Sequence, residues 1–241
     1  MRFLGTQRPG PADVMTMANA SCGASAVLVV IAYSGGSDLA NTGIRLVALL
    51  LLAGTIFDTL DGAFARRSGG TTLGGMLDSL ADAVTFGLAP AALLFQLGLR
   101  DAGQFERVLL VVGFLAYVCG ALLRLADFSS SRHADSHFTG LPSPLAAVSL
   151  LSLAFLTTEP LIVAAGMATA GLMMVSRLSY PMHRGPVVAA VAFAWVFGIA
   201  GTLGLYDVRI PAVVALLLIV VAMPALAVLE PHLRSDRSTV H

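Results

Sequence analysis

The stretch DTLDGAFARRSGGTTLGGMLDSLAD, from Asp58 to Asp82, decides how the rest of the chain is interpreted. It holds four of the fourteen acidic residues, and apolar sequence flanks it on both sides. Asp58 and Asp61 are three residues apart and Asp78 and Asp82 are four apart, so on helices each pair projects from one face. The Gly-rich linker between the pairs is long enough for two helices to meet antiparallel. The sequence therefore predicts four converging carboxylates at membrane depth, where charged groups are costly and typically functional.

This spacing also indicates a metal site. Clustered carboxylates stay ionised together only where cations compensate their charge. The stretch contains no Cys or His, so its ligand set is all oxygen, which favours Mg or Mn over Zn or Cu. The two pairs can hold two ions about 3.5–4 Å apart, an arrangement that supports phosphoryl chemistry. Gly62 lets a substrate approach the backbone, and Arg66 can fork onto a phosphate.

The same residues resemble the signature of the CDP-alcohol phosphotransferase family. The matching positions are Asp58-x-x-Asp61-Gly62-x-x-Ala65-Arg66 and, after seven residues, Gly74-x-x-x-Asp78-x-x-x-Asp82. The resemblance implies the fold of that family, which is an all-α polytopic membrane protein. It also implies roles for the carboxylates: Asp58 and Asp78 bridge both ions, Asp61 completes one, and Asp82 touches the other while acting as general base.

Several residues are candidates to bind the CDP part of CDP-diacylglycerol. The resemblance implies this role for Gly62, Arg66 and the neighbouring Ala65. Asn19, in the first apolar segment, is a further candidate, and its alternative is an interhelical hydrogen bond of the kind that polar residues make in bilayers. Thr71 and Thr72 lie in the linker, where they are either hinge residues or contact the CDP moiety through a hydroxyl.

Later segments narrow the resemblance to bacterial CDP-diacylglycerol–serine O-phosphatidyltransferases. These segments are 78–91, 121–128, 138–144 and 172–181, so that with the signature the resemblance covers roughly residues 14–182. It implies that the L-serine hydroxyl attacks CDP-diacylglycerol to give phosphatidylserine and CMP, a step of phospholipid biosynthesis. Arg124 and Arg177 are candidates to bind the serine carboxylate. Asp127 departs from the pattern, because a small or basic residue is expected there.

The composition agrees with a membrane enzyme. Of 241 residues, 57% are hydrophobic and 12% are charged, with a mean hydropathy of +0.86, whereas a soluble domain carries about twice that charged fraction. The net charge of zero gives no indication of a nucleic-acid partner. Apolar segments of the ~20 residues needed to span a bilayer predict about eight transmembrane helices, at about 14–34, 43–65, 74–98, 105–126, 143–158, 160–178, 186–205 and 209–229.

These spans divide the chain into four parts. They are a short cytoplasmic segment (1–13), a catalytic transmembrane domain (14–182), two further transmembrane helices (183–230) and a cytoplasmic tail (231–241). The chain has no lysine, and alternation of eight spans puts ten arginines on the side of both termini and four on the other. The positive-inside rule then places the termini and the acidic stretch in the cytoplasm, in the cell (inner) membrane. The N-terminal sequence also predicts no cleaved signal peptide.

Three alternatives stay open at this stage. The first keeps the chemistry and uses glycerol 3-phosphate or an inositol phosphate as acceptor, for which a denser basic cluster is expected. The second is an ion-coupled transporter, which predicts inverted repeats, although the acidic cluster has no counterpart near residues 170–200. The third is a non-catalytic assembly protein, which the complete ligand set disfavours. A homodimer is compatible with the family resemblance.

Overall fold

The computed structural model describes residues 10–36, 39, 41–68, 72–130, 140–176 and 214. Within these residues every secondary-structure element is a helix, as predicted. They are α1 (Pro11–Tyr33), α2 (Thr42–Ser68), α3 (Thr72–Asp82), η2 (Ala83–Leu88), α4 (Ala89–Leu99), α5 (Gln104–Ser130), α6 (Ser143–Leu156) and α7 (Pro160–Met174). Since α3, η2 and α4 follow one another without a break, they form one long helical rod in which η2 is a stretch of π-helix.

Four helical segments are long and apolar enough to cross a bilayer: Pro11–Tyr33, Thr42–Ala65, Leu73–Leu99 and Gln104–Ser129. They agree with the first four predicted spans to within three residues at each end. α6 and α7 are shorter, with 14 and 15 residues, and at 1.5 Å per residue each is roughly 21–23 Å long. The predicted seventh and eighth spans lie outside the described residues apart from Val214, so the number eight stays a prediction.

The break between α6 and α7 has a local cause. Thr157 is extended, with φ −155° and ψ 152°, so the helix ends there. The Thr157 hydroxyl accepts a hydrogen bond from the backbone N–H of Glu159 at 3.1 Å. Pro160 then opens α7, at a helix position where its missing N–H costs nothing. The two predicted spans therefore exist as separate helices, each ending a few residues earlier than the sequence predicts.

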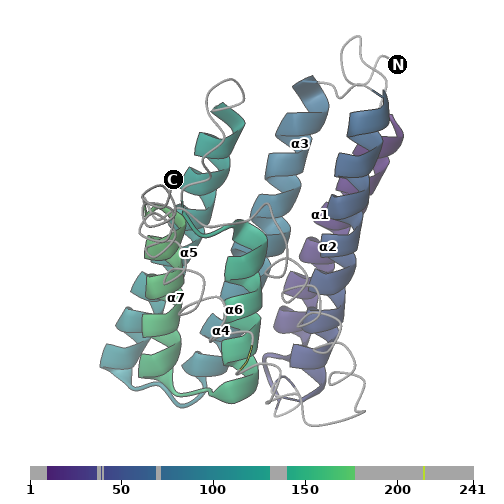
Figure 1. Ribbon diagram of the computed structural model, residues 1–241. Coiled ribbons are helices and arrows are strands. Elements are labelled where there is room, and N and C mark those ends of the chain that lie inside the picture. Colours follow the sequence, from purple (N-terminus) through teal and green to yellow (C-terminus); the bar gives the residue numbers. More distant parts are fainter. Residues whose placement is uncertain are drawn as a thin grey trace, which may run out of the picture.

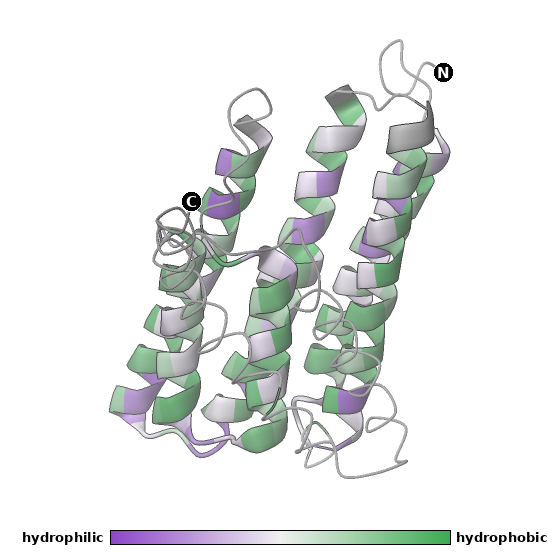
Figure 2. Cartoon of the chain, viewed as in Figure 1, coloured by the Kyte–Doolittle hydropathy of each residue, from purple (hydrophilic) through white to green (hydrophobic). Residues whose placement is uncertain are grey.

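The helices form a bundle, and the ends of four elements lie toward its top (Figure 1). α1 and α2 pack together, the α3–η2–α4 rod lies against α1, and α5 packs against α7. In Figure 1 the start of α1, the end of α2, the start of α3 and the end of α5 lie at the top, whereas α6 and α7 occupy the lower part. Figure 2 shows hydrophilic colours on the upper turns of α3 and α5 and mostly hydrophobic colours below.

Small residues allow α5 and α7 to approach closely. A methyl group added at Gly120 would lie 3.0 Å from the backbone carbon atoms of Gly171, and one added at Gly113 would lie 2.6 Å from the Ala164 carbonyl oxygen. Close backbone packing of this kind stabilises helix pairs in lipid, where apolar side chains gain little from association. The α5–α7 pair therefore forms a firm support beside the rod.

Candidate functional site

The acidic residues lie at the polar ends of two helices. Asp58 and Asp61 lie near the end of α2, one turn apart, and Asp78 and Asp82 lie in the second half of α3, again one turn apart. Asp61 is buried, with an exposed fraction of 6%. Because each pair sits on one face of its helix, the helix geometry itself aims the carboxylates at the facing helix.

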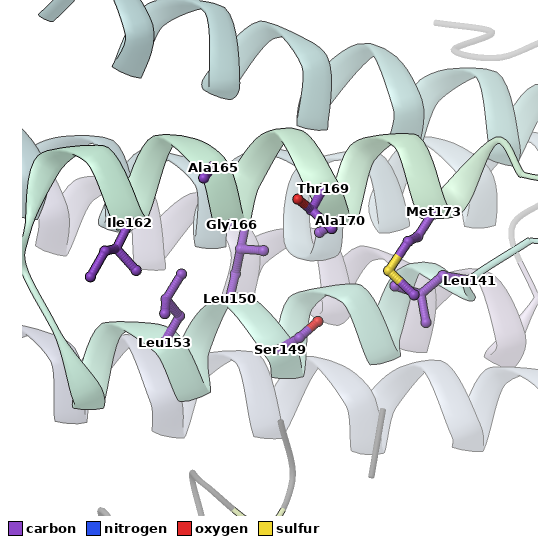
Figure 3. Close-up of a pocket in the computed structure, with 10 residues that line it drawn as sticks. All are labelled: Leu141, Ser149, Leu150, Leu153, Ile162, Ala165, Gly166, Thr169, Ala170 and Met173. Carbon is purple, nitrogen blue, oxygen red and sulfur yellow. The ribbon is translucent and has the colours of Figure 1, made fainter. Parts of the chain in front are cut away.

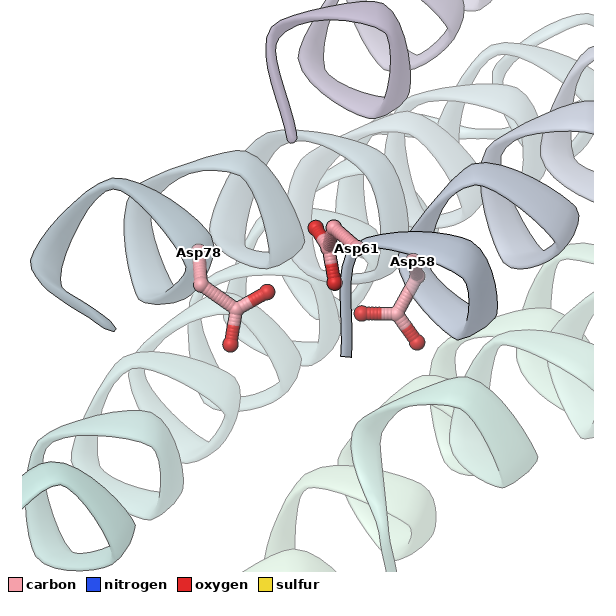
Figure 4. A group of neighbouring side chains, drawn as sticks. All are labelled: Asp58, Asp61 and Asp78. Carbon is pink, nitrogen blue, oxygen red and sulfur yellow. The ribbon is translucent and has the colours of Figure 1, made fainter. Parts of the chain in front are cut away.

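Three of the carboxylates converge on one point (Figure 4). Asp58, Asp61 and Asp78 each offer an oxygen, and these oxygens lie within 4.8 Å of one another. Asp82 adjoins the group, because its carboxyl lies within hydrogen-bonding reach of Asp58. The structure thus brings together the residues that the spacing predicts, from helices joined by the linker. Their action as ligands stays a prediction.

The donor set of this acidic cluster fits a divalent cation. Oxygens around an octahedral Mg²⁺ lie about 2.1 Å from the ion, and therefore roughly 3.0–4.2 Å from one another. The three carboxylate oxygens lie within 4.8 Å of one another, which is slightly farther apart than this range. Modest side-chain rotations would bring them to the distances that an ion requires. All donors are hard, negatively charged oxygens, which suits Mg or Mn. The cluster is therefore compatible with divalent metal binding.

α1 contributes two buried polar side chains to the acidic cluster. Thr16 Oγ1 donates a hydrogen bond to Asp61 Oδ2 at 2.8 Å, and Asn19 Nδ2 donates one to Asp82 Oδ1 at 3.1 Å. Thr16 is 2% exposed and Asn19 is fully buried. Asn19 thus makes the interhelical hydrogen bond that the sequence left open, and its contact with CDP stays a prediction. Thr16, which is likewise polar in the first apolar segment, makes an interhelical hydrogen bond of the same kind.

The π-helix η2 begins directly after Asp82 and contacts α1. Thr85 in η2 donates a hydrogen bond to the backbone carbonyl of Asn19 at 2.9 Å. A methyl group added at Gly23 would lie 2.6 Å from Thr85 Cα, so the two backbones are in direct contact at this point. π-turns are frequent at functional sites, and this one follows Asp82 directly in the chain. Neither Thr85 nor the π-helix was predicted.

η2 is also held from the other side, by α5. The Tyr117 hydroxyl donates to the Phe86 carbonyl at 2.9 Å, and both side chains are fully buried. Nearer the polar end, the hydroxyls of Ser79 on α3 and Ser129 on α5 lie 2.6 Å apart. Sequence periodicity gives no signal for these contacts, because they join residues 31 and 50 positions apart. They secure the second acidic helix against α5.

Arg124, predicted to bind the acceptor, has a visible structural contact. Its Nε donates to the Leu141 carbonyl at 2.7 Å, and the Leu141 N–H donates to the Met173 carbonyl at 3.0 Å. Arg124 therefore ties α5 to the segment that leads into α6. Its guanidinium also interacts electrostatically with Asp127 of the same helix and, more weakly, with Asp82. Binding of an acceptor by Arg124 stays a prediction.

The remaining predicted residues are less fully described. Gly62 and Ala65 are half-buried in the last turns of α2, beyond Asp61. The structure describes Arg66 and Thr72 by their helical backbone alone. Thr71 and Arg177 lie outside the described residues. The roles of these residues in binding CDP-diacylglycerol and the acceptor stay predictions.

An apolar pocket of about 270 Å³ lies elsewhere, between α6 and α7 (Figure 3). Leu150, Leu153, Ile162 and Met173 are among the residues that line it. Ser149 points its hydroxyl back to carbonyls of its own helix, at 2.9 and 3.0 Å, so it offers the pocket little polarity. The pocket includes none of the predicted site residues.

Comparison with known proteins agrees with this geometry. The model of the CDP-alcohol phosphatidyltransferase family matches residues 11–228. Archaetidylserine synthase of Methanothermobacter thermautotrophicus is 34% identical over 178 residues, covering 72% of this chain and 70% of that protein. CDP-diacylglycerol–serine O-phosphatidyltransferase of Bacillus subtilis is 30% identical over 172 residues, covering 71% and 89%. Since the family match spans most of the chain and contains the acidic cluster, this protein belongs to the CDP-alcohol phosphatidyltransferase family.

Proposed function

We propose that this protein is an integral membrane phosphatidyltransferase that makes phosphatidylserine and CMP from CDP-diacylglycerol and L-serine. The observation that carries the proposal is the convergence of Asp58, Asp61 and Asp78 at the polar end of apolar helices. Such a position lets the acyl chains of a substrate stay in lipid while its headgroup reaches the carboxylates. The protein would then act in phospholipid biosynthesis.

The four aspartates would hold two divalent cations, Mg or Mn. Asp58, Asp61, Asp78 and Asp82 would hold them through their carboxylate oxygens, with the division of roles that the family resemblance implies. When bound, the cations neutralise the pyrophosphate and the charge that develops on the leaving CMP. The proximity of the Asp58 and Asp82 carboxyls supports this shared arrangement, because two carboxylates this close stay ionised together only where a cation compensates their charge.

Asp82 would also be the general base. The serine hydroxyl gives its proton to the Asp82 carboxylate, and its oxygen forms a bond to the phosphorus attached to diacylglycerol. The bond from that phosphorus to the CMP oxygen breaks, and CMP leaves. The interhelical bond from Asn19 supports this role, because a base must be held in a fixed orientation toward the proton it accepts.

The CDP part of the donor would lie along the end of α2 and the linker. Gly62 and Ala65 are small, so the nucleotide can approach the backbone there, and Arg66 would bind a phosphate. Thr71 and Thr72 would supply hydroxyl contacts at the linker, and Asn19 is the remaining candidate for a CDP contact. The half-buried positions of Gly62 and Ala65 next to Asp61 support this placement.

Serine is favoured as the acceptor. The two relatives described above carry different lipids in their names but share the serine, which supports serine over glycerol 3-phosphate or an inositol phosphate. Arg124 and Arg177 would bind the serine carboxylate, and the electrostatic interaction of the Arg124 guanidinium with Asp127 and Asp82 supports a position of Arg124 near the acidic cluster. An ion-coupled transporter is the less favoured alternative.

The proposed location is the cell (inner) membrane, with the acidic cluster and both termini toward the cytoplasm. The distribution of arginines supports this orientation. It can be tested by labelling single cysteines, placed near either terminus, from outside intact cells. The homodimer stays a prediction, and the mass of the purified protein in detergent tests it.

The decisive experiment measures CMP release by detergent-purified protein with CDP-diacylglycerol and Mg or Mn. L-Serine, glycerol 3-phosphate, inositol phosphate and no acceptor are compared. We expect release with serine, abolished by Asp82→Asn. Release with a different acceptor alone would keep the phosphatidyltransferase chemistry and refute serine as substrate. If folded protein releases no CMP with any acceptor, the proposed reaction is refuted.

A further inference from the structure

We propose that α1 positions the metal ligands, with Thr16 and Asn19 each holding one carboxylate oxygen of Asp61 and Asp82. This inference rests on the proposed metal site and adds two residues to it. Thr16 and Asn19 are three residues apart on one face of α1 and reach one to each acidic helix. α1 thus joins α2 and α3 at the level of their carboxylates. Thr16 and Asn19 are positioning residues, since they would act through the aspartates.

The first contact favours the carboxylate over the alternative within the helix. Thr16 Oγ1 lies 2.8 Å from Asp61 Oδ2 and 3.0 Å from the Ala12 carbonyl oxygen. A hydroxyl has one proton, and a helical threonine always has the carbonyl four residues back within reach. The charged acceptor makes the stronger bond, so the proton goes to Asp61. Thr16 is only 2% exposed, so water does not compete for its hydroxyl.

The second contact explains why an amide lies at a fully buried position. Asn19 Nδ2 donates to Asp82, whereas Asn19 Oδ1 has no hydrogen-bond partner among the described residues. Turning the amide over would set Oδ1 against the carboxylate, so the chemistry fixes its orientation. A residue kept for packing alone would be apolar here, because a buried oxygen without a partner is costly. The amide is therefore explained by its bond to Asp82.

Neighbouring contacts fix the Asn19 side chain. Thr85 holds the Asn19 backbone carbonyl at 2.9 Å. Gly54 on α2 leaves room for the amide, because a methyl group added there would lie 2.9 Å from Asn19 Oδ1. The side chain is thus confined between α2 and η2. Its donor group has one direction in which to point, which is toward Asp82.

The two bonds select particular ligands. They fall on the second aspartate of each pair, and these are the residues for which the resemblance implies contact with a single ion. A carboxylate whose one oxygen is engaged by a fixed donor presents the other oxygen to a cation. The α1 contacts would therefore favour one metal-facing oxygen each on Asp61 and Asp82. Removing either contact would let its carboxylate turn and would weaken metal binding.

The test measures Mn²⁺ affinity directly, by the loss of the electron paramagnetic resonance signal of free Mn²⁺ on titration of purified protein. The variants are Thr16→Val and Asn19→Leu, which keep the shape and remove the donor. Loss of residues that hold metal ligands typically weakens binding about 10–100-fold, and we expect a loss in this range. Thr16→Ser, which keeps the hydroxyl, should bind within about threefold of the parent.

Ser21→Ala is the matched control, because the Ser21 hydroxyl donates to the Met17 carbonyl of its own helix and is exposed. It should leave Mn²⁺ affinity unchanged. If Asn19→Leu does not fold, Gly54→Ala replaces it, since the added methyl would lie 2.9 Å from Asn19 Oδ1 and 2.7 Å from Thr85 Cγ2 and removes no polar group. Folding is checked by a single symmetric peak in gel filtration and by thermal unfolding.

Asp58→Asn separates failure of this inference from failure of the proposed site. If Asp58→Asn loses Mn²⁺ while Thr16→Val and Asn19→Leu bind like the parent, the α1 inference is wrong and the metal site stands. If the parent binds no Mn²⁺, or Asp58→Asn binds it equally well, the proposed metal site itself fails. An equal loss in Thr16→Val and Thr16→Ser would also overturn the inference, because the hydroxyl would then not be what matters.

Discussion

Replacing Gly23 by alanine should disable the site without touching an acidic residue. Gly23 faces η2, and a methyl group there would lie 2.6 Å from Thr85 Cα and 2.8 Å from Thr85 N. Carbon atoms in contact prefer about 3.5–4.0 Å, so α1 and η2 would have to separate by about 1 Å. Backbone atoms cannot turn aside, so the separation moves whole helices.

The displacement reaches Asp82 through Asn19, which lies one turn from Gly23 on α1. The Asn19–Asp82 hydrogen bond is 3.1 Å long, and a shift of about 1 Å would carry it beyond hydrogen-bonding distance. A misplacement of about 1 Å at a reacting group can cost about 10²-fold in rate. We therefore expect Gly23→Ala to lower kcat for CMP release by about 100-fold.

The assay is CMP release with saturating L-serine and CDP-diacylglycerol, on protein shown to be monodisperse. Gly35→Ala is the matched control, because an added methyl at Gly35 meets nothing within 4 Å. It should leave kcat unchanged. If Gly23→Ala folds and keeps kcat within about twofold of the parent, the contact of α1 with η2 does not position Asp82 and the reasoning is wrong.

Four further outcomes are expected. Tyr117→Phe leaves the Phe86 carbonyl in η2 without its phenol donor and should lower the free energy of unfolding by about 1–3 kcal/mol, measured by thermal unfolding in detergent. Gly120→Ala forces α5 from Gly171 and should cost about 1–3 kcal/mol in the same measurement. Chelation with EDTA should abolish CMP release, and Mg or Mn should restore it. Arg124→Lys, which cannot donate in the same geometry, should raise the KM for serine and leave the KM for CDP-diacylglycerol unchanged.

The sequence was informative wherever the structure depends on local spacing. Asp58, Asp61 and Asp78 converge because intervals of three and four residues fix a helix face, and a short linker brings the two faces together. The first four spans were predicted for a similar reason, since hydropathy over about 20 residues is itself a local property. Both features depend on residues that lie close together in the sequence.

For contacts between distant segments the sequence left the partner open, since it marked Asn19 as a candidate for an interhelical hydrogen bond and named no acceptor. The bonds from Thr16 to Asp61 and from Asn19 to Asp82 join residues 45 and 63 positions apart. The π-helix at Ala83–Leu88 has an ordinary apolar sequence, and its hydrogen bonds from Thr85 to α1 and from Tyr117 of α5 to Phe86 join residues far apart in the chain. Interhelical geometry is set by packing, and local spacing and hydropathy do not reveal which polar groups meet.

The division between the aspartates and the residues that hold them has a physical basis. The four aspartates lie within 25 residues because they come from two consecutive helices, so one linker suffices to form the cluster. The hydrogen-bond donors that orient Asp61 and Asp82 come from a third helix, α1, and not from the two helices that carry the aspartates. α1 and α5 supply this support, through Asn19 and Thr16 on one side and Tyr117 on the other. A change in α1 should therefore alter metal affinity and rate together, whereas a change at Tyr117 should first appear in stability.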